Sequence, residues 1–232
     1  PNRLYQGHGE TTVRDAGTGA GIREMVEQRR SSAANQLVAP RLVLCQRWPL
    51  PLGQWDEGNT PDKARAMVRE FKTLGADCVK VSKSPGHYPD VLEAIVAEAK
   101  TLGIFVMTDL KVSETDAAVA SNAGVRSIEH WYGVPDAALQ GSQNFPPDYN
   151  YWDELDRFRW AGKLWEEADR NPERLSEVID LLIANGTNWN PTMVVYEKNR
   201  DLARAVTLPW RETLVHPDQL AAGPDTTVHG AY

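Results

Sequence analysis

Short apolar runs alternate along the chain with longer segments that carry charges on one side. The runs RLVLCQ (41–46), CVKVS (78–82) and IFVMTD (104–109) are rich in apolar and β-branched residues, which favours strands. Four of the five longer segments begin at capping or proline positions and end at glycine, which favours helices. The pattern predicts strands at 11–15, 41–46, 78–82, 104–109 and 125–130 with a sixth inside 187–197, and helices at 20–34, 61–74, 89–102, 114–123 and 171–185.

This regular alternation predicts an α/β fold. Strand–helix units of about 25 residues favour a parallel sheet, because each right-handed crossover places a helix outside the strands. The result is either a doubly wound sheet or a (β/α)₈ TIM barrel. After residue 130 the regular alternation of predicted strands and helices ends. Residues 131–170 are rich in aromatic side chains and loop-forming residues. We expect a single domain over residues 1–232, with 131–170 as an aromatic-rich insertion over one end of the sheet.

Charge and composition narrow the range of partners. The 232 residues carry a formal net charge of −7, which argues against nucleic acid or an anionic membrane as the main partner. No apolar run approaches 18 residues, so we expect no membrane-spanning helix. Cys45 and Cys78 both lie in apolar strand-like contexts, and we predict buried free thiols rather than a disulfide. The sequence begins without an initiator Met or a leader pattern, so localisation stays open.

Polar side chains gather at the ends of three successive predicted strands. Lys80 lies within the third strand, Asp109 ends the fourth, and His130 ends the fifth beside Glu129. Active sites of parallel sheets lie at the carboxyl ends of the strands, where these residues would converge. Asp and His suit a divalent metal, whereas a protonated lysine has no lone pair and serves as a ligand only if carbon dioxide carbamylates it.

Each of these residues also has a structural alternative. A lone lysine in a strand is often a salt-bridge partner, here of Asp77 or Asp109, and taken individually each residue favours its structural role. His130 alone is typical of a hydrogen-bonded core residue, and a strand-terminal Asp often caps the next helix. The shared position at strand ends favours a common site over three separate structural roles.

Four stretches resemble the metal-dependent amidohydrolase superfamily, in particular its imidazolonepropionase- and prolidase-like branch. They are GHGETTVRDAG (7–17), LGADCVKVSKS (74–84), ASNAGVRSIEHWYG (120–133) and NWNPTMVVYE (188–197). The resemblance implies a (β/α)₈ barrel with one or two divalent metal ions, usually zinc. It also implies hydrolysis of amide, cyclic amide or ester bonds by a metal-activated water. The matching stretches correspond to about strands two to seven, so we expect an incomplete barrel.

The same resemblance assigns roles to individual residues. Lys80 matches the carbamylated fourth-strand lysine that bridges two metals, and His130 matches the sixth-strand histidine ligand. Asp109 stands where the fifth-strand histidine is expected, or Thr108 if the alignment shifts by one residue. The H-x-H motif of the first strand and the Asp of the eighth have no counterpart here. We therefore expect weak metal binding, and an open sheet edge that invites a homo-oligomer or a complementing chain.

Two functional hypotheses follow. The first is a metal-dependent hydrolase of a small-molecule or peptide-like substrate, with Lys80 and His130 catalytic and Trp131 and Tyr132 contacting the substrate. The aromatic stretch 131–165 would bind that substrate or pack against neighbouring helices, and both readings stay open. The second is a non-catalytic or degenerate barrel that acts as a binding or scaffold protein. The missing motifs favour the second hypothesis, and the retained Lys80 and His130 favour the first.

Overall fold

A computed structural model describes most of the chain. The described residues are 2–17, 21–48, 58–84, 86–112, 114–140, 144–150, 152–194, 209, 211–214 and 217–221. The chain divides into two compact units, residues 1–190 and 191–232. The second unit contains the short helices α11 (Arg211–Leu214) and α12 (Pro217–Ala221). The single domain expected over residues 1–232 stays a prediction.

The first unit is built on a parallel sheet. Its strands are β1 (Thr12–Asp15), β2 (Arg41–Trp48), β3 (Cys78–Val81), β4 (Phe105–Asp109), β5 (Ser127–Glu129) and β6 (Asn188–Asn190). The strands pair in sequence order, and every neighbouring pair is parallel. A doubly wound sheet reverses its strand order at a switch point, whereas a barrel keeps sequence order. The order therefore rules out the doubly wound alternative and matches part of a TIM barrel.

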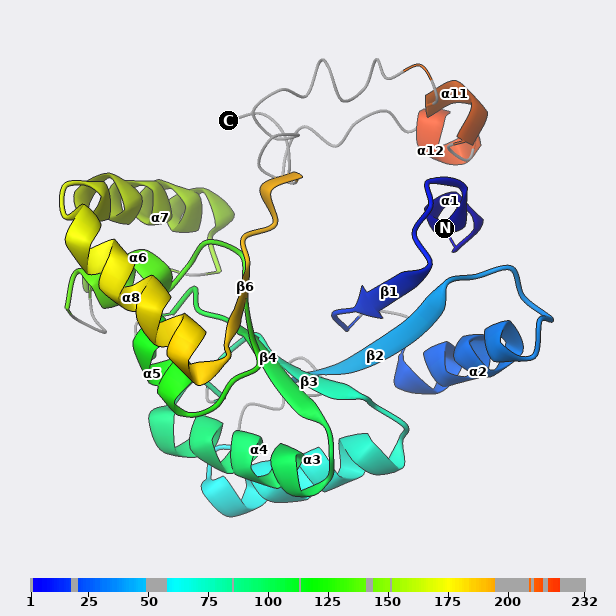
Figure 1. Ribbon diagram of the computed structural model, residues 1–232, viewed down its shortest axis with the longest axis horizontal. Coiled ribbons are helices and arrows are strands. Elements are labelled where there is room, and N and C mark those ends of the chain that lie inside the picture. Colours follow the sequence, from blue (N-terminus) through cyan, green and yellow to red (C-terminus); the bar gives the residue numbers. More distant parts are fainter. Residues whose placement is uncertain are drawn as a thin grey trace. The chain divides into compact units, whose positions relative to one another are not determined.

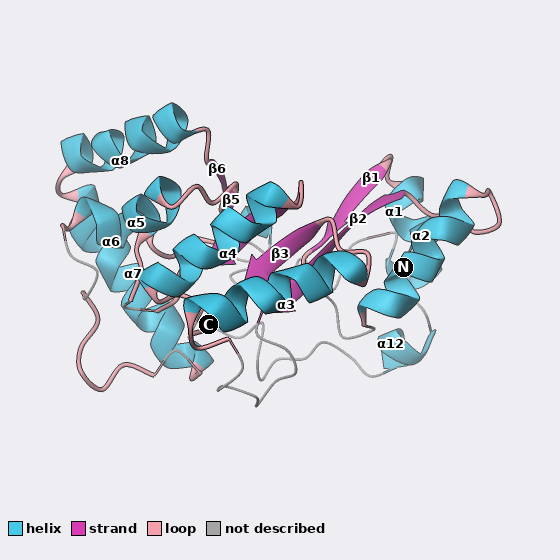
Figure 2. Ribbon diagram, turned by 90° about the horizontal axis from the view of Figure 1, so that it is seen from below, coloured by secondary structure: helices cyan, strands magenta, loops and turns pink. Residues whose placement is uncertain are grey.

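Helices α2 (Ile22–Ala33), α3 (Pro61–Thr73), α4 (Pro89–Thr101), α5 (Ala117–Asn122) and α8 (Pro172–Asn185) follow the outer side of this curled sheet (Figure 1). The first unit also contains α1 (Asn2–Gly7), α6 (Val134–Ala138) and α7 (Glu154–Asp169). Seen from below, β3 is visible between α3 and α4 (Figure 2). In the described part of the chain, no helix is long and apolar enough to cross a membrane.

Local sequence explains where α3 starts, what it buries and where it stops. The Thr60 hydroxyl accepts a hydrogen bond from the Lys63 backbone N–H, and Pro61 occupies the first turn. The buried residues recur at helical spacing and pack against the sheet: Ala64, Met67, Val68 and Phe71. The chain then turns at Gly75, whose φ of 97° favours glycine.

The two faces of the sheet differ in chemistry. Side chains on the outer face, such as Val81 and Ile128, belong to the main core beneath the helices. On the inner face, Cys45, Cys78 and Met107 form a separate apolar cluster. The next residues toward the carboxyl ends of the inner face are polar, and they are Lys80, Asp109 and Glu129. An apolar layer thus supports a polar layer at the edge where barrel enzymes carry their sites.

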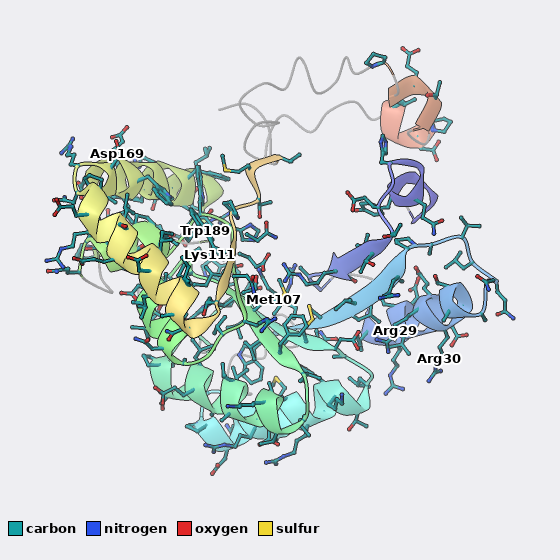
Figure 3. The ribbon with its side chains drawn as sticks, viewed as in Figure 1. Arg29, Arg30, Met107, Lys111, Asp169 and Trp189 are labelled. Carbon is teal, nitrogen blue, oxygen red and sulfur yellow. A yellow bond between two sulfur atoms is a disulfide. The ribbon has the colours of Figure 1, made fainter. Side chains whose placement is uncertain are left out.

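The prediction of two free thiols is wrong, because Cys45 and Cys78 form a disulfide. They are direct partners in the β2–β3 register, with their Cα atoms 4.3 Å apart. Both side chains lie on the inner face, so adjacent strands bring together two residues that are 33 positions apart in the chain. Sulfur–sulfur bonds are yellow in Figure 3, where Met107 of the same cluster is labelled.

Residues 131–170 are more regular than the expected loop-rich segment. They include α6 and the 16-residue helix α7. The Asp153 carboxylate caps α7 by accepting hydrogen bonds from the N–H groups of Leu155 and Asp156. The buried or partly buried residues of α7 also recur at helical spacing, at Ala161, Leu164, Trp165 and Ala168. The high aromatic content concealed this helical periodicity.

Candidate functional site

The candidate site centres on a buried ion pair at the carboxyl end of the inner face. The Lys80 Nζ lies 4.0 Å from Oδ2 of Asp109, and the two residues are only 4% and 5% exposed. In the β3–β4 register Lys80 is the partner of Met107, so Asp109 lies two residues further along on the same face. The structure therefore brings two of the predicted site residues together.

Burial changes the protonation behaviour of both partners. It lowers the pKa of Lys80, although Asp109 and Glu129 act in the opposite direction. Burial alone would raise the pKa of Asp109, but Lys111, Lys80 and nearby histidines outweigh it and hold that pKa below its usual range. The other Asp109 oxygen, Oδ1, is buried without a hydrogen-bond partner among the described residues. The pair combines an amine of lowered pKa with a buried carboxylate oxygen that accepts no hydrogen bond from the described residues.

His130 lies just past the end of β5 in a left-handed backbone conformation, with φ at 65°. Its N–H donates to the Asn190 carbonyl at 2.8 Å, and its carbonyl accepts from the Trp189 indole at 2.7 Å. Burial, followed by the positive charge of Lys80, lowers the pKa of His130 to about 4, against the effects of Asp109 and Glu129. The imidazole is therefore neutral at neutral pH and has a lone pair for a metal or a proton.

Thr108 and Asp109 lie on opposite faces of β4, as alternation requires. The Thr108 hydroxyl donates to the Asp109 carbonyl at 3.0 Å and lies 3.0 Å from the Nε2 atom of His87. When that hydroxyl proton goes to the Asp109 carbonyl, the contact with His87 requires an Nε2–H donor, which leaves the lone pair of the ring on Nδ1. His87 is fully buried, and its Nδ1 has no partner among the described residues. Sequence reasoning missed this histidine, which supports the strand end that carries Asp109.

Glu129 is an inner-face residue whose role the sequence did not reveal. Its carboxylate accepts hydrogen bonds from the side chains of Arg14, Ser127 and Asn190. Arg14 belongs to β1, four strand spacings from β5, or about 19 Å across a flat sheet. Their 2.8 Å ion pair is therefore possible only because the sheet curls. The alternation of Ser127, Ile128 and Glu129 was the available signal that Glu129 lies inside.

Trp131 and Tyr132 pack mainly against α7. The Trp131 ring contacts Phe158 edge to face at a centroid distance of 5.5 Å, and its carbonyl accepts from the Trp165 indole. Tyr132 is 5% exposed, and its hydroxyl accepts from Arg157 Nε at 3.1 Å. The Tyr132 ring also lies edge to face with the His130 ring, 6.4 Å between centroids. These contacts match the packing alternative, and the substrate role of both residues stays a prediction.

The donor groups at this edge fit the expected metal only in part. Among the described residues, no group of three His, Cys, Asp or Glu side chains is arranged to hold a metal ion. Asp109 and His130 supply two suitable donors, and Lys80 becomes a third only as a carbamate. The buried, unpartnered Oδ1 of Asp109 and the lowered pKa of Lys80 both fit that modification.

Comparisons with known proteins do not assign a family. No family model and no curated protein matches the sequence. A candidate prolidase from Bifidobacterium longum is 26% identical over 52% of this chain and 32% of its own, with a TM-score of 0.41. An amidohydrolase with bound Zn from Burkholderia ambifaria is 16% identical over 66% of this chain and 49% of its own, with a TM-score of 0.34.

A third solved structure is an aldolase. The deoxyribose phosphate aldolase from Aeropyrum pernix is 16% identical over 83% of this chain and 89% of its own, with a TM-score of 0.33. All three TM-scores are below 0.5, so these likenesses support no functional argument. The match spans about a third of the length of the candidate prolidase and about half of the length of the amidohydrolase.

Proposed function

We propose that the chain provides the central part of a metal-dependent amidohydrolase that hydrolyses an amide, cyclic amide or ester bond of a small-molecule or peptide-like substrate. The observation that carries this proposal is the buried Lys80–Asp109 pair, 4.0 Å apart at the carboxyl edge of a barrel-type sheet. Burying ionisable side chains costs desolvation free energy. Ionisable groups with perturbed pKa values concentrate at functional sites.

Carbamylation explains why an amine lies at this position. The neutral Lys80 amine attacks carbon dioxide, a C–N bond forms, and one proton leaves to solvent. The carboxylate would form at the Lys80 Nζ, which lies 4.0 Å from Asp109 Oδ2, and His130 would offer a neutral imidazole from the neighbouring strand end. These three groups would hold a divalent ion, with zinc suited to mixed nitrogen and oxygen donors. When bound, such an ion lowers the pKa of water and polarises the scissile carbonyl.

Zinc retention tests this proposal directly. The chain is freed of metal with chelator, incubated with Zn²⁺ with and without bicarbonate, desalted and subjected to elemental analysis. We expect bicarbonate-dependent zinc below one ion per chain, abolished in Lys80→Ala and retained in the control Lys100→Ala, which alters an exposed lysine on α4. The ¹³C signal of a carbamate formed from ¹³C-bicarbonate should be absent in Lys80→Ala. It should be present in the parent chain and in Lys100→Ala. Equal zinc retention in both variants would contradict the proposal.

A binding or scaffold role is the second candidate. It is favoured by the lack of a three-residue metal group in the described part of the chain. If the folded chain takes up no zinc with bicarbonate and cleaves none of a panel of dipeptides, N-acyl amino acids and lactones, the scaffold role replaces the hydrolase. Bicarbonate-dependent zinc together with cleavage of any panel member would exclude it.

A further inference from the structure

Cationic side chains collect around the carboxyl edge of β2, β3 and β4. Arg47 is the register partner of Lys80, while Lys83 and Lys111 each follow a strand by two residues. This is unexpected for a chain whose net charge is −7. Lys111, labelled in Figure 3, is held through its carbonyl, which accepts the Tyr149 hydroxyl at 2.9 Å.

Several carboxylates lie near these cations. Glu129 is engaged by Arg14 at 2.8 Å, and Glu114 accepts a hydrogen bond from Ser84. Asp109 lies 4.0 Å from Lys80 and is also within electrostatic range of Lys111. Within the described residues, neither Arg47 nor Lys111 forms a salt bridge of its own. Arg47 and Lys111 therefore act on Lys80 with positive charges that no salt bridge among these residues neutralises.

The cations also affect one another. Burial lowers the pKa of Lys83, and the positive charges of Lys111 and Arg47 lower it further. Arg47 and Lys111 contribute in the same direction to the lowered pKa of Lys80. Electrostatic repulsion among these cations is unfavourable, and it is relieved when an anion lies among them.

We propose that Arg47, Lys83 and Lys111 bind an anionic group, a carboxylate or a phosphate, of the ligand that reaches Lys80. The arginine guanidinium matches two oxygens of either group, and a lysine adds a point charge. Lys83 is positioned by the Trp152 ring, with its Nζ 4.0 Å from the ring centroid. Calling this ligand a substrate rests on the proposed hydrolase function, whereas anion binding itself does not.

Calorimetric titration tests the anion site. The probes are inorganic phosphate and N-acetylalanine, each added at constant ionic strength so that general screening is held fixed. We expect Arg47→Gln and Lys111→Gln each to weaken binding about tenfold, as for loss of one charge-assisted contact. Lys111→Arg should restore affinity. The controls Arg65→Gln and Lys100→Gln, both on the outer helices, should bind like the parent chain.

The two probes and an activity assay separate the outcomes. Tighter phosphate binding identifies a phosphate-bearing ligand, and tighter N-acetylalanine binding identifies a carboxylate-bearing one. If anions bind at this edge but no panel substrate is cleaved, the anion site stands and the hydrolase proposal fails. If cleavage occurs and Arg47→Gln and Lys111→Gln affect neither binding nor turnover, the hydrolase stands and the anion site is refuted. Absence of saturable binding by either probe would also refute it.

Discussion

Burial decides the protonation state of individual residues around the site. Lys80 and His130 both have lowered pKa values because their charged forms are separated from water. At neutral pH the imidazole is neutral, and the amine loses its proton more readily than an exposed lysine does. The neutral imidazole carries the lone pair that ligation requires, and the lowered pKa of Lys80 favours the neutral amine that carbamylation requires.

The carboxyl group of Asp136 makes the stability of the protein depend on pH. Burial, together with nearby Asp116, raises its pKa to about 7, against the hydrogen bond from the Gly133 N–H. Because the unfolded value is 3.8, the folded state binds the extra proton between about pH 4 and 7. This carboxyl therefore stabilises the protein at low pH, and its contribution is lost as pH rises through 7, by up to about 1.4 kcal/mol per pH unit.

Urea unfolding of Asp136→Asn across that range measures this contribution. The difference in unfolding free energy between the variant and the parent should change steadily from pH 4.5 to 7 in favour of the variant, since Asn does not ionise. His130 has the opposite sign, because its lowered pKa makes stability fall as pH drops from 6.5 toward 4. That effect is present in both proteins and cancels in the difference. A pH-independent difference would show that Asp136 ionises normally.

Among the elements, α7 offers a matched pair of substitutions. Asp153 caps its first turn through two backbone N–H groups, whereas Asp169 is the last residue of the same helix (Figure 3). Removing the cap with Asp153→Ala should lower the unfolding free energy by about 1 kcal/mol. Asp169→Ala should leave it unchanged or slightly raised, because a carboxylate is unfavourable at a helix C-terminus. Equal losses in urea unfolding would rule out the capping role.

The elements that could be predicted are those whose signals are local. All six strands and the helices α2, α3, α4, α5 and α8 correspond to sequence segments predicted from apolar runs, caps and terminal glycines. Helix α7 was missed because its aromatic residues suggested an insertion, although its buried positions follow helical spacing. The Cys45–Cys78 disulfide was missed because it depends on the register between β2 and β3, which no local pattern determines.

Some contacts of the candidate site could likewise be predicted from local sequence, whereas others depend on the three-dimensional fold. Lys80 and Asp109 could be placed together because each ends or interrupts an apolar strand, and parallel strands align their carboxyl ends. The Arg14–Glu129 pair could not, because it joins residues 115 positions apart across the inside of the curl. His87 was hidden in a turn, and only the fold brings it to Thr108.

For the first folded unit as a whole, the Arg14–Glu129 pair measures how firmly the curl of the sheet is held. The Glu129 side chain is 6% exposed and Arg14 31%, so the two ends of the ion pair differ in access to water. Arg14→Met leaves a buried carboxylate without its cation and should lower the unfolding free energy by about 3–5 kcal/mol. Glu129→Gln leaves a partly hydrated arginine and should lower it by less, about 1–3 kcal/mol. The double variant should lose less than the sum of the two.

Urea unfolding of the three variants tests this asymmetry. The control is Arg65→Met, which breaks an exposed pair with Asp62 and should change stability by less than about 1 kcal/mol. If β1 is joined to β5 through this pair, the two single substitutions are non-additive because each removes the same interaction across the curl. Additive losses, or a loss with Arg14→Met no larger than with Arg65→Met, would mean that β1 is held by its pairing with β2 alone and that the curl does not depend on the ion pair.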